Sequence, residues 1–540
     1  MDTVAALSRL LLLVGAAISV ATLVVLARPA GGWGRRLRRR LLLGVPWGTL
    51  LTVGLVVGFY LFVQGGVDRW YAPVVIPFRA WSYFYPLGML TAGLAHSGPA
   101  HLTGNVLGTL VFGSLAEYAW SHFPTAQGEQ SFTAARTNPF VRLFAVPAAA
   151  VVLAVLTGAF ALGPVVGFSG VVFALAGVAV VRYPVTAVVL LAAGDLVGLV
   201  YRSLRTPVIE ASGSVGYSTP WWADIAIQGH ALGVLAGFLL GIVLFRARDE
   251  LPSPARVWLG VAAYAVSQGL WAVYLFEGGD SFVLYRAAGL GLVLLLAALV
   301  SAAAGASPRA LIARIDLSRR EAAVGLLACV LLALAVVAVP YNLLIVGDAA
   351  PDQGTVEVRD YTVFYAEDVE NQYVAAYDLP FYNASNVTTS GVVVASADRQ
   401  VWWTVVSKGR LAFAGKQRVH LGGPGWRDTV VANRTGWSVV GNRSVYAVRL
   451  RHNDTATLAY TSASARAEPT VAERNVTLGV VAGEFTVAVS RNGTRLARVP
   501  IPARNTSVSA GGLSVVNRDG SLFVARNGTR VRVAARETYR

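Results

Sequence analysis

The sequence predicts an all-α polytopic membrane domain followed by an all-β extracytoplasmic domain. Two observations lead to this prediction. Of the 540 residues, 55% are hydrophobic and only 14% are charged, which is far too apolar for a soluble protein of this length. Apolar runs long enough to cross roughly 30 Å of hydrocarbon recur along the first 347 residues, and the chain then changes to short runs of alternating apolar and polar residues.

Ten apolar runs are candidate transmembrane helices. They lie near residues 7–27, 41–64, 100–120, 140–163, 168–183, 185–203, 225–246, 256–277, 282–304 and 321–346. The predicted domains are 1–40, an extra N-terminal transmembrane helix with a basic cytoplasmic loop; 41–246, a six-helix core; 247–347, three additional transmembrane helices; and 348–540, a β-rich domain outside the cytoplasm. The core therefore has about four extra helices around it.

The net charge of +16 comes almost entirely from arginine, and the arginines gather in loops. The basic clusters at 35–40, 246–250 and 314–320 stand at alternate ends of the runs, as expected if these loops stay in the cytoplasm. The charge therefore indicates membrane topology, and nucleic acid is not an expected partner. The first run could be a cleaved signal peptide, but cleavage would leave the 35–40 cluster at an outer N-terminus, so an uncleaved helix with Met1 outside is favoured.

With Met1 outside, ten crossings return the chain to the outside, which predicts a multi-pass protein of the cell membrane with its C-terminal domain outside. Glycosylation sequons agree with this count, because all nine lie in the tail and none in the ten-run segment. The candidate asparagines are Asn383, Asn386, Asn433, Asn442, Asn453, Asn475, Asn492, Asn505 and Asn527. The alternative is that an Asn- and Thr-rich β domain collects sequons by chance.

The tail carries the signals of β-hairpins. Asn-Gly, Asp-Gly and Gly-Gly turns separate its alternating runs, which predicts a β-sandwich or a pair of small β domains. Two RNGTR segments, at 491–495 and 526–530, are either a weak internal repeat or one turn used twice. The tail shows no catalytic or metal-binding cluster, so any chemistry is expected in the membrane domain.

Polar residues at membrane depth are candidates for a functional site, because their desolvation must be offset. The segment HSGPAHLTGN opens the third run, and His101 and Asn105 in it share one helix face about one turn apart. His96 precedes that helix. The segment GPVVGFSG places Ser169 at a helix N-terminus, where a serine commonly serves as an N-cap but where backbone N–H groups could also stabilise a negative charge.

A third polar position lies on a helix built for close packing. Glycines recur every fourth residue from Gly229 to Gly241, and His230 stands beside this strip. Small residues at Gly170, Ala174 and Gly177 form a complementary strip on the serine helix. If the strips pack together, Ser169 and His230 meet near the outer end of both helices, at the depth of the first motif.

A serine with a histidine base and oxyanion donors is the minimum equipment for acyl transfer. His230 would take the Ser169 proton and return it to the leaving amine. His101, Asn105 and the Ser169 N–H would stabilise the oxyanion. No Asp or Glu is an obvious third member, and Phe173, one turn below Ser169, could pack on the imidazole and hold its orientation.

These residues resemble the rhomboid family of intramembrane serine proteases over about residues 41–246. The matching motifs are H-x4-H-x3-N at His96, His101 and Asn105, G-x-S-G at Gly167, Phe168, Ser169 and Gly170, and H-x2-G-x3-G at His230, Gly233 and Gly237. The resemblance implies a Ser169–His230 dyad, an oxyanion site with His101 and Asn105, and transmembrane protein substrates cut near the outer membrane face. His96, Gly167, Gly170 and Phe173 are supporting candidates.

Other functions remain open from the sequence. A proteolytically inactive relative that binds or escorts membrane proteins would be expected to have lost Ser169 or His230, yet both are present. A transporter would be expected to show inverted repeats or midplane ionisable residues, and neither is evident. Zinc binding by His96 and His101 lacks a further ligand at suitable spacing. The expected partners are transmembrane substrates and the lipid bilayer, with no metal or cofactor.

Overall fold

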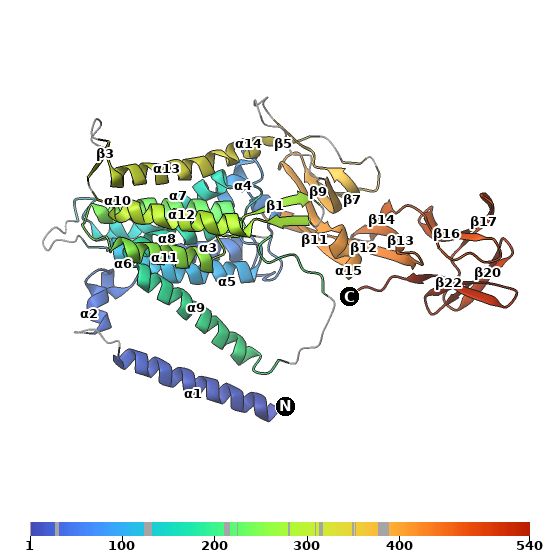
Figure 1. The fold of residues 1–540 in the computed structure, drawn as a ribbon, viewed down its shortest axis with the longest axis horizontal. Helices are drawn as coiled ribbons and strands as arrows, with labels where there is room; N and C mark the ends of the chain where they lie inside the picture. The colour runs from blue at the N-terminus through green and yellow to red at the C-terminus, as the bar shows by residue number, and fades with distance from the viewer. Residues whose placement is uncertain are drawn as a thin grey trace. The chain divides into compact units, whose positions relative to one another are not determined.

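The chain divides into two compact units in a computed structural model (Figure 1). The first comprises Met1–Phe276 and Phe282–Leu344, and the second is formed chiefly by Ile345–Ala376 and Asn383–Arg540. The structure describes residues 2–26, 32–123, 132–209, 216–223, 225–278, 281–307, 309–312, 317–347, 350–351, 353–375 and 388–540. Two of the predicted glycosylation sites, Asn383 and Asn386, lie outside these residues.

The first unit is almost entirely helical. Its longer helices are α1 (Asp2–Leu26), α3 (Trp47–Gly58), α5 (Pro99–Gly108), α7 (Pro139–Phe160), α8 (Ser169–Arg182), α9 (Pro184–Arg205), α10 (Ile227–Arg246), α11 (Pro254–Ser267), α12 (Arg286–Gly305) and α13 (Arg319–Val336). Shorter ones are α2 (Trp33–Arg38), α4 (Pro86–Thr91), α6 (Ser114–Trp120) and α14 (Ala338–Asn342). Single π-turns, Phe59–Val63 and Thr109–Gly113, extend α3 and join α5 to α6.

This unit makes the chain a multi-pass membrane protein. In the described part, six helices have the length and apolar composition to span a membrane: Thr3–Leu26, Pro139–Phe160, Pro184–Arg205, Ile227–Arg246, Arg286–Gly305 and Arg319–Asn342. Trp47–Val63 and Ser169–Arg182 are shorter apolar helices. Each of the ten predicted runs contains a helix, but how many of them cross the membrane stays a prediction.

Two predicted runs were wrong in extent. The run 256–277 is helical only to Ser267, because Gly269 adopts a left-handed φ of 70° and the chain then enters strand β1 (Tyr274–Gly278). The run 321–346 breaks after Val336 and ends in strand β5 (Leu344–Val346). Pro340 has no N–H to bond the Val336 carbonyl, so the α-helical pattern cannot continue unbroken there.

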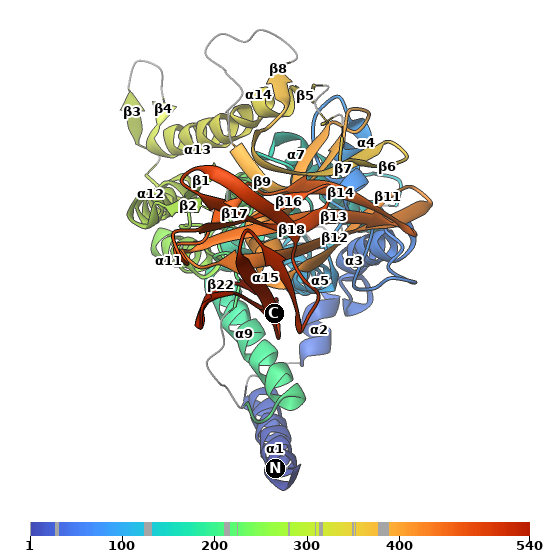
Figure 2. The same ribbon diagram turned by 90° about the vertical axis from the view of Figure 1, so that its right-hand side faces the viewer.

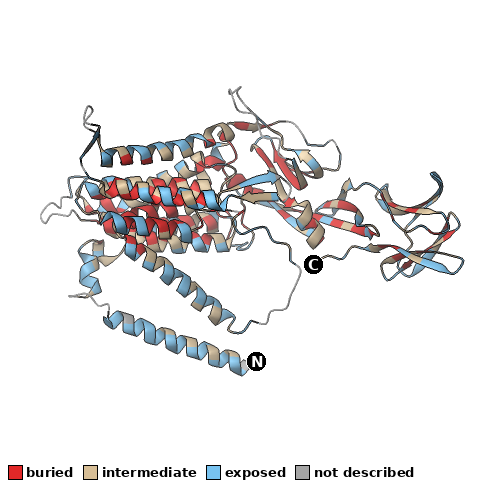
Figure 3. Ribbon diagram, viewed as in Figure 1, coloured by how far each residue is buried: buried red, intermediate tan, exposed pale blue. Residues whose placement is uncertain are grey.

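Helix α8 packs against α10, and these two helices carry more buried residues than any other helix in the described part of the first unit (Figure 3). A Cβ on Gly233 would lie 2.1 Å from the Gly170 carbonyl oxygen, and a Cβ on Gly237 would lie 2.1 Å from the Ala174 carbonyl oxygen. A Cβ on Gly177 would lie 2.6 Å from the Val234 oxygen. The two strips of small residues therefore pack against each other, as the sequence predicted.

Helix α9 leaves this bundle soon after it begins. Only Pro184 and Ala187 are buried along its length, and the remainder extends away from α8 and α10 in both views (Figures 1 and 2). Near its end, the Leu204 carbonyl accepts a hydrogen bond from Arg9 of α1. Helices α11 and α12 lie on the opposite side of the bundle from α3 (Figure 2), and α13 contacts α10 directly.

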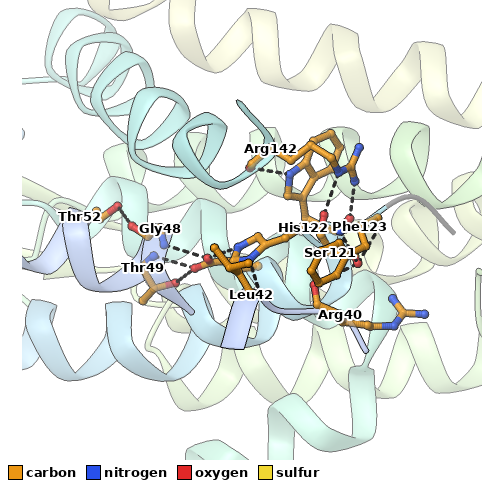
Figure 4. A network of polar contacts seen from close by, with 11 residues as sticks. Arg40, Leu42, Gly48, Thr49, Thr52, Ser121, His122, Phe123 and Arg142 are labelled. Carbon is orange, nitrogen blue, oxygen red and sulfur yellow. Dashed lines mark hydrogen bonds and ion pairs between the residues drawn. The ribbon is translucent and has the colours of Figure 1, made fainter. Parts of the chain in front are cut away.

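A buried polar network fixes the start of α3 at the end of the bundle away from Ser169 (Figure 4). Glu117 is only 1% exposed and accepts hydrogen bonds from the Gly48 and Thr49 N–H groups, at 2.8 and 2.6 Å, and from the Thr49 hydroxyl. His122 lies 2.6 Å from the same carboxylate and accepts from the Leu42 N–H. Glu117 thus caps α3 from another helix, a role that its position in the sequence did not reveal.

The second unit is built from antiparallel sheets. A four-stranded sheet has the order β10-β9-β7-β6, and a larger sheet runs β14-β13-β12-β22-β21-β20-β19 with β11 paired to β12. A further sheet has the order β15-β16-β17-β18. The strands are β6 (Val356–Val358), β7 (Tyr361–Glu370), β9 (Thr388–Ser396), β10 (Val401–Ser407), β11 (Lys416–Gly423), β12 (Trp426–Val439), β13 (Arg443–His452), β14 (Thr455–Thr461), β15 (Ala465–Arg466), β16 (Asn475–Val481), β17 (Glu484–Arg491), β18 (Thr494–Pro500), β19 (Thr506–Ala510), β20 (Leu513–Arg518), β21 (Ser521–Arg526) and β22 (Thr529–Arg536).

The C-terminal part of this unit is a sandwich. Val476 and Val487 from one sheet share a core with Val515, Val524 and Val533 from the other. The two RNGTR segments both form two-residue hairpin turns, between β17 and β18 and between β21 and β22. Each turn places Asn and Gly at φ values of 49° and 82°, as a type I′ turn requires, so the similarity between them includes the same turn used twice.

A buried ion pair links β12 to the C-terminal end of the chain. The Arg434 guanidinium donates to both carboxylate oxygens of Glu537, at 2.7 and 3.0 Å, and the Tyr539 hydroxyl donates to the same carboxylate at 2.8 Å. Burial raises the pKa of Glu537, but these donors outweigh it and hold that pKa below its ordinary value of 4.5.

The second unit is predicted to lose stability in acid partly through Glu537. Because the pKa of Glu537 is lower in the folded chain, its contribution is complete above pH 4.5 and is lost as the pH falls through the folded value. Hydrogen exchange of peptides from β12 and β22 in the full-length protein, between about pH 6 and 3, measures this loss. Glu537→Gln should be less stable at neutral pH and should show a flatter pH dependence; an unchanged slope would contradict the assignment.

Candidate active site

Ser169 begins helix α8 at the end of a constrained loop. The Gly167 N–H donates to the Ala92 carbonyl at 2.8 Å, and Gly167 has a φ of 128°, which favours glycine. The N-cap position of α8 is Phe168, and no side chain caps the helix. Ser169 is therefore not the N-cap of α8.

The Ser169 hydroxyl instead meets His230. The distance between Ser169 Oγ and His230 Nε2 is 2.8 Å, which is a hydrogen bond between residues 61 apart in the chain. If Nε2 accepts the serine proton, the imidazole carries its own proton on Nδ1. That Nδ1 is buried, and no described residue accepts a hydrogen bond from it. The pair thus has no carboxylate partner within the described part of the chain.

Phe173 packs on the imidazole as the sequence predicted. The two ring centroids are 4.2 Å apart and the planes are 13° from parallel, so the rings stack. Both residues face each other from neighbouring helices, α8 and α10. The hydrogen bond to Ser169 still allows the His230 ring to turn about the direction of that bond. The stack on Phe173 restricts this rotation.

His101 and Asn105 face the loop that precedes the serine. A Cβ on Gly167 would lie 2.5 Å from His101 Nε2 and 3.6 Å from Asn105 Nδ2. Any larger residue at 167 would therefore displace the His101 ring. The two side chains thus lie against Gly167, two positions before Ser169 in the chain.

His96 holds Asn105 in place. Its ring is fully buried, with Nδ1 3.1 Å from the Leu94 carbonyl oxygen and Nε2 3.0 Å from Asn105 Nδ2. The carbonyl can only accept, so Nδ1 donates and Nε2 accepts one Asn105 amide hydrogen. The second hydrogen of that amide stays available. The Gln64 side chain binds the His96 backbone on both sides: its Oε1 accepts from the His96 N–H at 2.8 Å, and its Nε2 donates to the His96 carbonyl at 2.9 Å.

Ser97 is a site residue that the sequence did not single out. Its hydroxyl lies 3.1 Å from His101 Nδ1. If the hydroxyl donates to Nδ1, the His101 proton sits on Nε2, on the side of the ring that faces Gly167. The signal for this contact was the i, i+4 spacing of Ser97 and His101 at a helix start, which is too common to identify a functional pair.

A cavity of about 30 Å³ touches the Ser169 and His230 side chains. Its other walls are small residues, including Gly158, Ala161, Gly170, Ala226 and Gly229. The space corresponds to about one water molecule.

These features define a polytopic membrane protein with a serine–histidine pair inside its helical bundle. Residues 83–247 match the family model for the rhomboid domain. The chain therefore contains a rhomboid domain, and His96, His101, Asn105, Ser169 and His230 lie within it. Comparison with curated proteins and with solved structures gives no match.

Proposed function

We propose that the protein is an intramembrane serine endopeptidase that cuts transmembrane proteins near the outer membrane face. The observation that carries this proposal is the 2.8 Å hydrogen bond between Ser169 Oγ and His230 Nε2 within a rhomboid domain. An inactive member that only binds or escorts membrane proteins would not need this pair intact, so the contact favours the protease.

In the proposed mechanism, Ser169 Oγ attacks the substrate carbonyl carbon while His230 Nε2 takes the hydroxyl proton. The oxyanion receives hydrogen bonds from the Ser169 N–H, His101 and Asn105. His230 then gives its proton to the amine as the peptide bond breaks, which leaves an acyl-enzyme. His230 next removes a proton from water, which attacks the ester, and Ser169 recovers its hydrogen when the acid product leaves.

Labelling with a fluorophosphonate probe tests this function without a known substrate. The native protein in membranes is expected to become covalently labelled, whereas Ser169→Ala and His230→Ala are expected to lose labelling. Ser301→Ala is the matched control, because its hydroxyl bonds the Pro254 carbonyl in a contact that involves neither Ser169 nor His230. Labelling of the Ser169→Ala variant at the native level would rule out Ser169 as the nucleophile.

The proposal extends to topology. The four domains predicted from the sequence would place residues 41–246 as the catalytic core and residues 348–540 outside the cell membrane. Five sequon asparagines support the outer location of residues 348–540, because a glycan could be attached to them without disturbing a strand. They occupy exposed turn positions with left-handed backbone: Asn442, Asn453, Asn492, Asn505 and Asn527. Asn433 and Asn475 lie within strands β12 and β16.

In right-side-out vesicles, added protease is expected to remove the C-terminal domain while the membrane core survives. Glycosidase treatment of the intact protein is expected to shift its mobility, and Asn492→Gln combined with Asn527→Gln should reduce that shift if the hairpin turns are used. Protection of residues 350–540 until the vesicles are permeabilised would contradict an outer location.

A further inference from the structure

Helices α11 and α13 lie outside the matched rhomboid domain, yet both reach the surroundings of His230. The contact from α11 is made by Tyr264, which is 1% exposed. Its ring meets the Phe173 ring edge-on, with centroids 5.7 Å apart and planes at 76°. Phe173 in turn stacks on His230, so three rings from α11, α8 and α10 form a continuous series.

Tyr264 is held on its other side as well. Its ring meets Phe112 edge-on, with centroids 5.5 Å apart and planes at 89°. Phe112 belongs to the π-turn between α5 and α6, on the helical segment that carries His101 and Asn105. Tyr264 therefore fills the space between the segment with the oxyanion candidates and the helix with the nucleophile. A smaller side chain there would let Phe173 move away from the imidazole.

The contact from α13 reaches the first turn of α10. Gln228, two residues before His230, donates to the Leu334 carbonyl on α13 at 2.8 Å and to the Phe160 carbonyl at the end of α7 at 2.9 Å. Its Oε1 accepts from the Leu162 N–H at 2.9 Å. This one amide side chain joins three segments immediately before the base.

We propose that Tyr264 and Gln228 are positioning residues for His230, so that the helices behind the rhomboid domain form part of the working active site. The physical reason is the unpartnered Nδ1 of His230. No carboxylate among the described residues orients the imidazole, so its direction depends on the serine hydrogen bond, the Phe173 stack and the placement of the first turn of α10. Tyr264 supports the stack and Gln228 supports the turn. This inference rests on the proposed function of the pair.

The test compares fluorophosphonate labelling kinetics of full-length variants in membranes. Tyr264→Leu is expected to lower the maximal labelling rate constant about 10- to 100-fold, as small misplacements of catalytic groups do, with little change in the half-saturating probe concentration. Tyr264→Phe keeps the ring and should label within about twofold of native. Val257→Ala is the matched control, since it shortens another fully buried side chain of α11, seven residues before Tyr264, and leaves all three rings in place.

Gln228→Met provides a second variant of similar size that removes all three hydrogen bonds, and it should also lower the maximal rate. Thermal unfolding of each variant separates positioning from general destabilisation. The inference is overturned if labelling slows equally in Tyr264→Leu and Val257→Ala. It is also overturned if Tyr264→Leu and Gln228→Met both label at the native rate. Neither result would affect the assignment of Ser169 as the nucleophile. If the native protein shows no Ser169-dependent labelling, the proposed function fails and the inference fails with it.

Discussion

Alanine at Ser169 or at His230 is expected to lower the rate of peptide-bond cleavage by about 10⁶-fold, and alanine at both positions should lower it no further. In the proposed mechanism, the two side chains share one proton transfer across a 2.8 Å hydrogen bond, so removing either one removes the function of both. The measurement is single-turnover cleavage, in proteoliposomes, of a labelled transmembrane peptide with small or helix-breaking residues near its outer end.

Asn105→Ala provides the graded comparison in the same assay. An oxyanion donor contributes less than a nucleophile or base, so this variant should retain the dyad and lose roughly 10²- to 10³-fold in turnover. The residual cleavage should still disappear when Ser169→Ala is added. Multiplicative losses for Ser169→Ala and His230→Ala, or a loss for Asn105→Ala as large as theirs, would argue against these assigned roles.

Gly237→Ala is expected to destabilise the membrane domain by about 3 kcal/mol, near the upper end of the usual cost of overpacking. The added Cβ would lie 2.1 Å from the Ala174 carbonyl oxygen, and because this obstacle is backbone, α8 and α10 must separate to admit it. Separation of these helices also lengthens the contact between Ser169 and His230. The variant should therefore unfold earlier in a denaturant titration in mild detergent and label more slowly with fluorophosphonate.

Gly325→Ala is the matched control for this change. Gly325 lies within α13, and no atom comes within 4 Å of the position that its Cβ would take. The same substitution there should change stability by no more than about 1 kcal/mol. Equal effects at both positions would show that loss of glycine, and not the contact with α8, causes the destabilisation.

Much of this organisation could be predicted from the sequence because it depends on short spacings. The four-residue recurrence of Gly233 and Gly237, and the small residues Gly170 and Ala174, predicted the α8–α10 contact that the structure contains. Asn-Gly turns likewise predicted the hairpins of the second unit. In both cases a local pattern determines which surfaces can approach each other.

Contacts that join distant segments could not be predicted in this way. Tyr264 and Gln228 have no spacing that links them to Phe173 or Leu334, and their roles depend on how the helices behind the rhomboid domain pack. Glu117 lies within the predicted run 100–120, but its partners Gly48 and Thr49 lie nearly 70 residues earlier. The ends of α11 and α13 were missed because apolar composition alone does not distinguish a helix from the short strands that follow.

The unpartnered Nδ1 of His230 has a consequence for inactive variants of this protein. In the described structure, Ser169 is the one polar group that anchors the imidazole, so the proposed nucleophile and the proposed base each depend on the other for orientation. Ser169→Ala would release the ring to turn within its stack on Phe173. In a substrate complex of that variant, the His230 ring would therefore have an orientation different from the native one. A complex of the native protein with a covalent inhibitor keeps Ser169 and should preserve the native orientation of the ring.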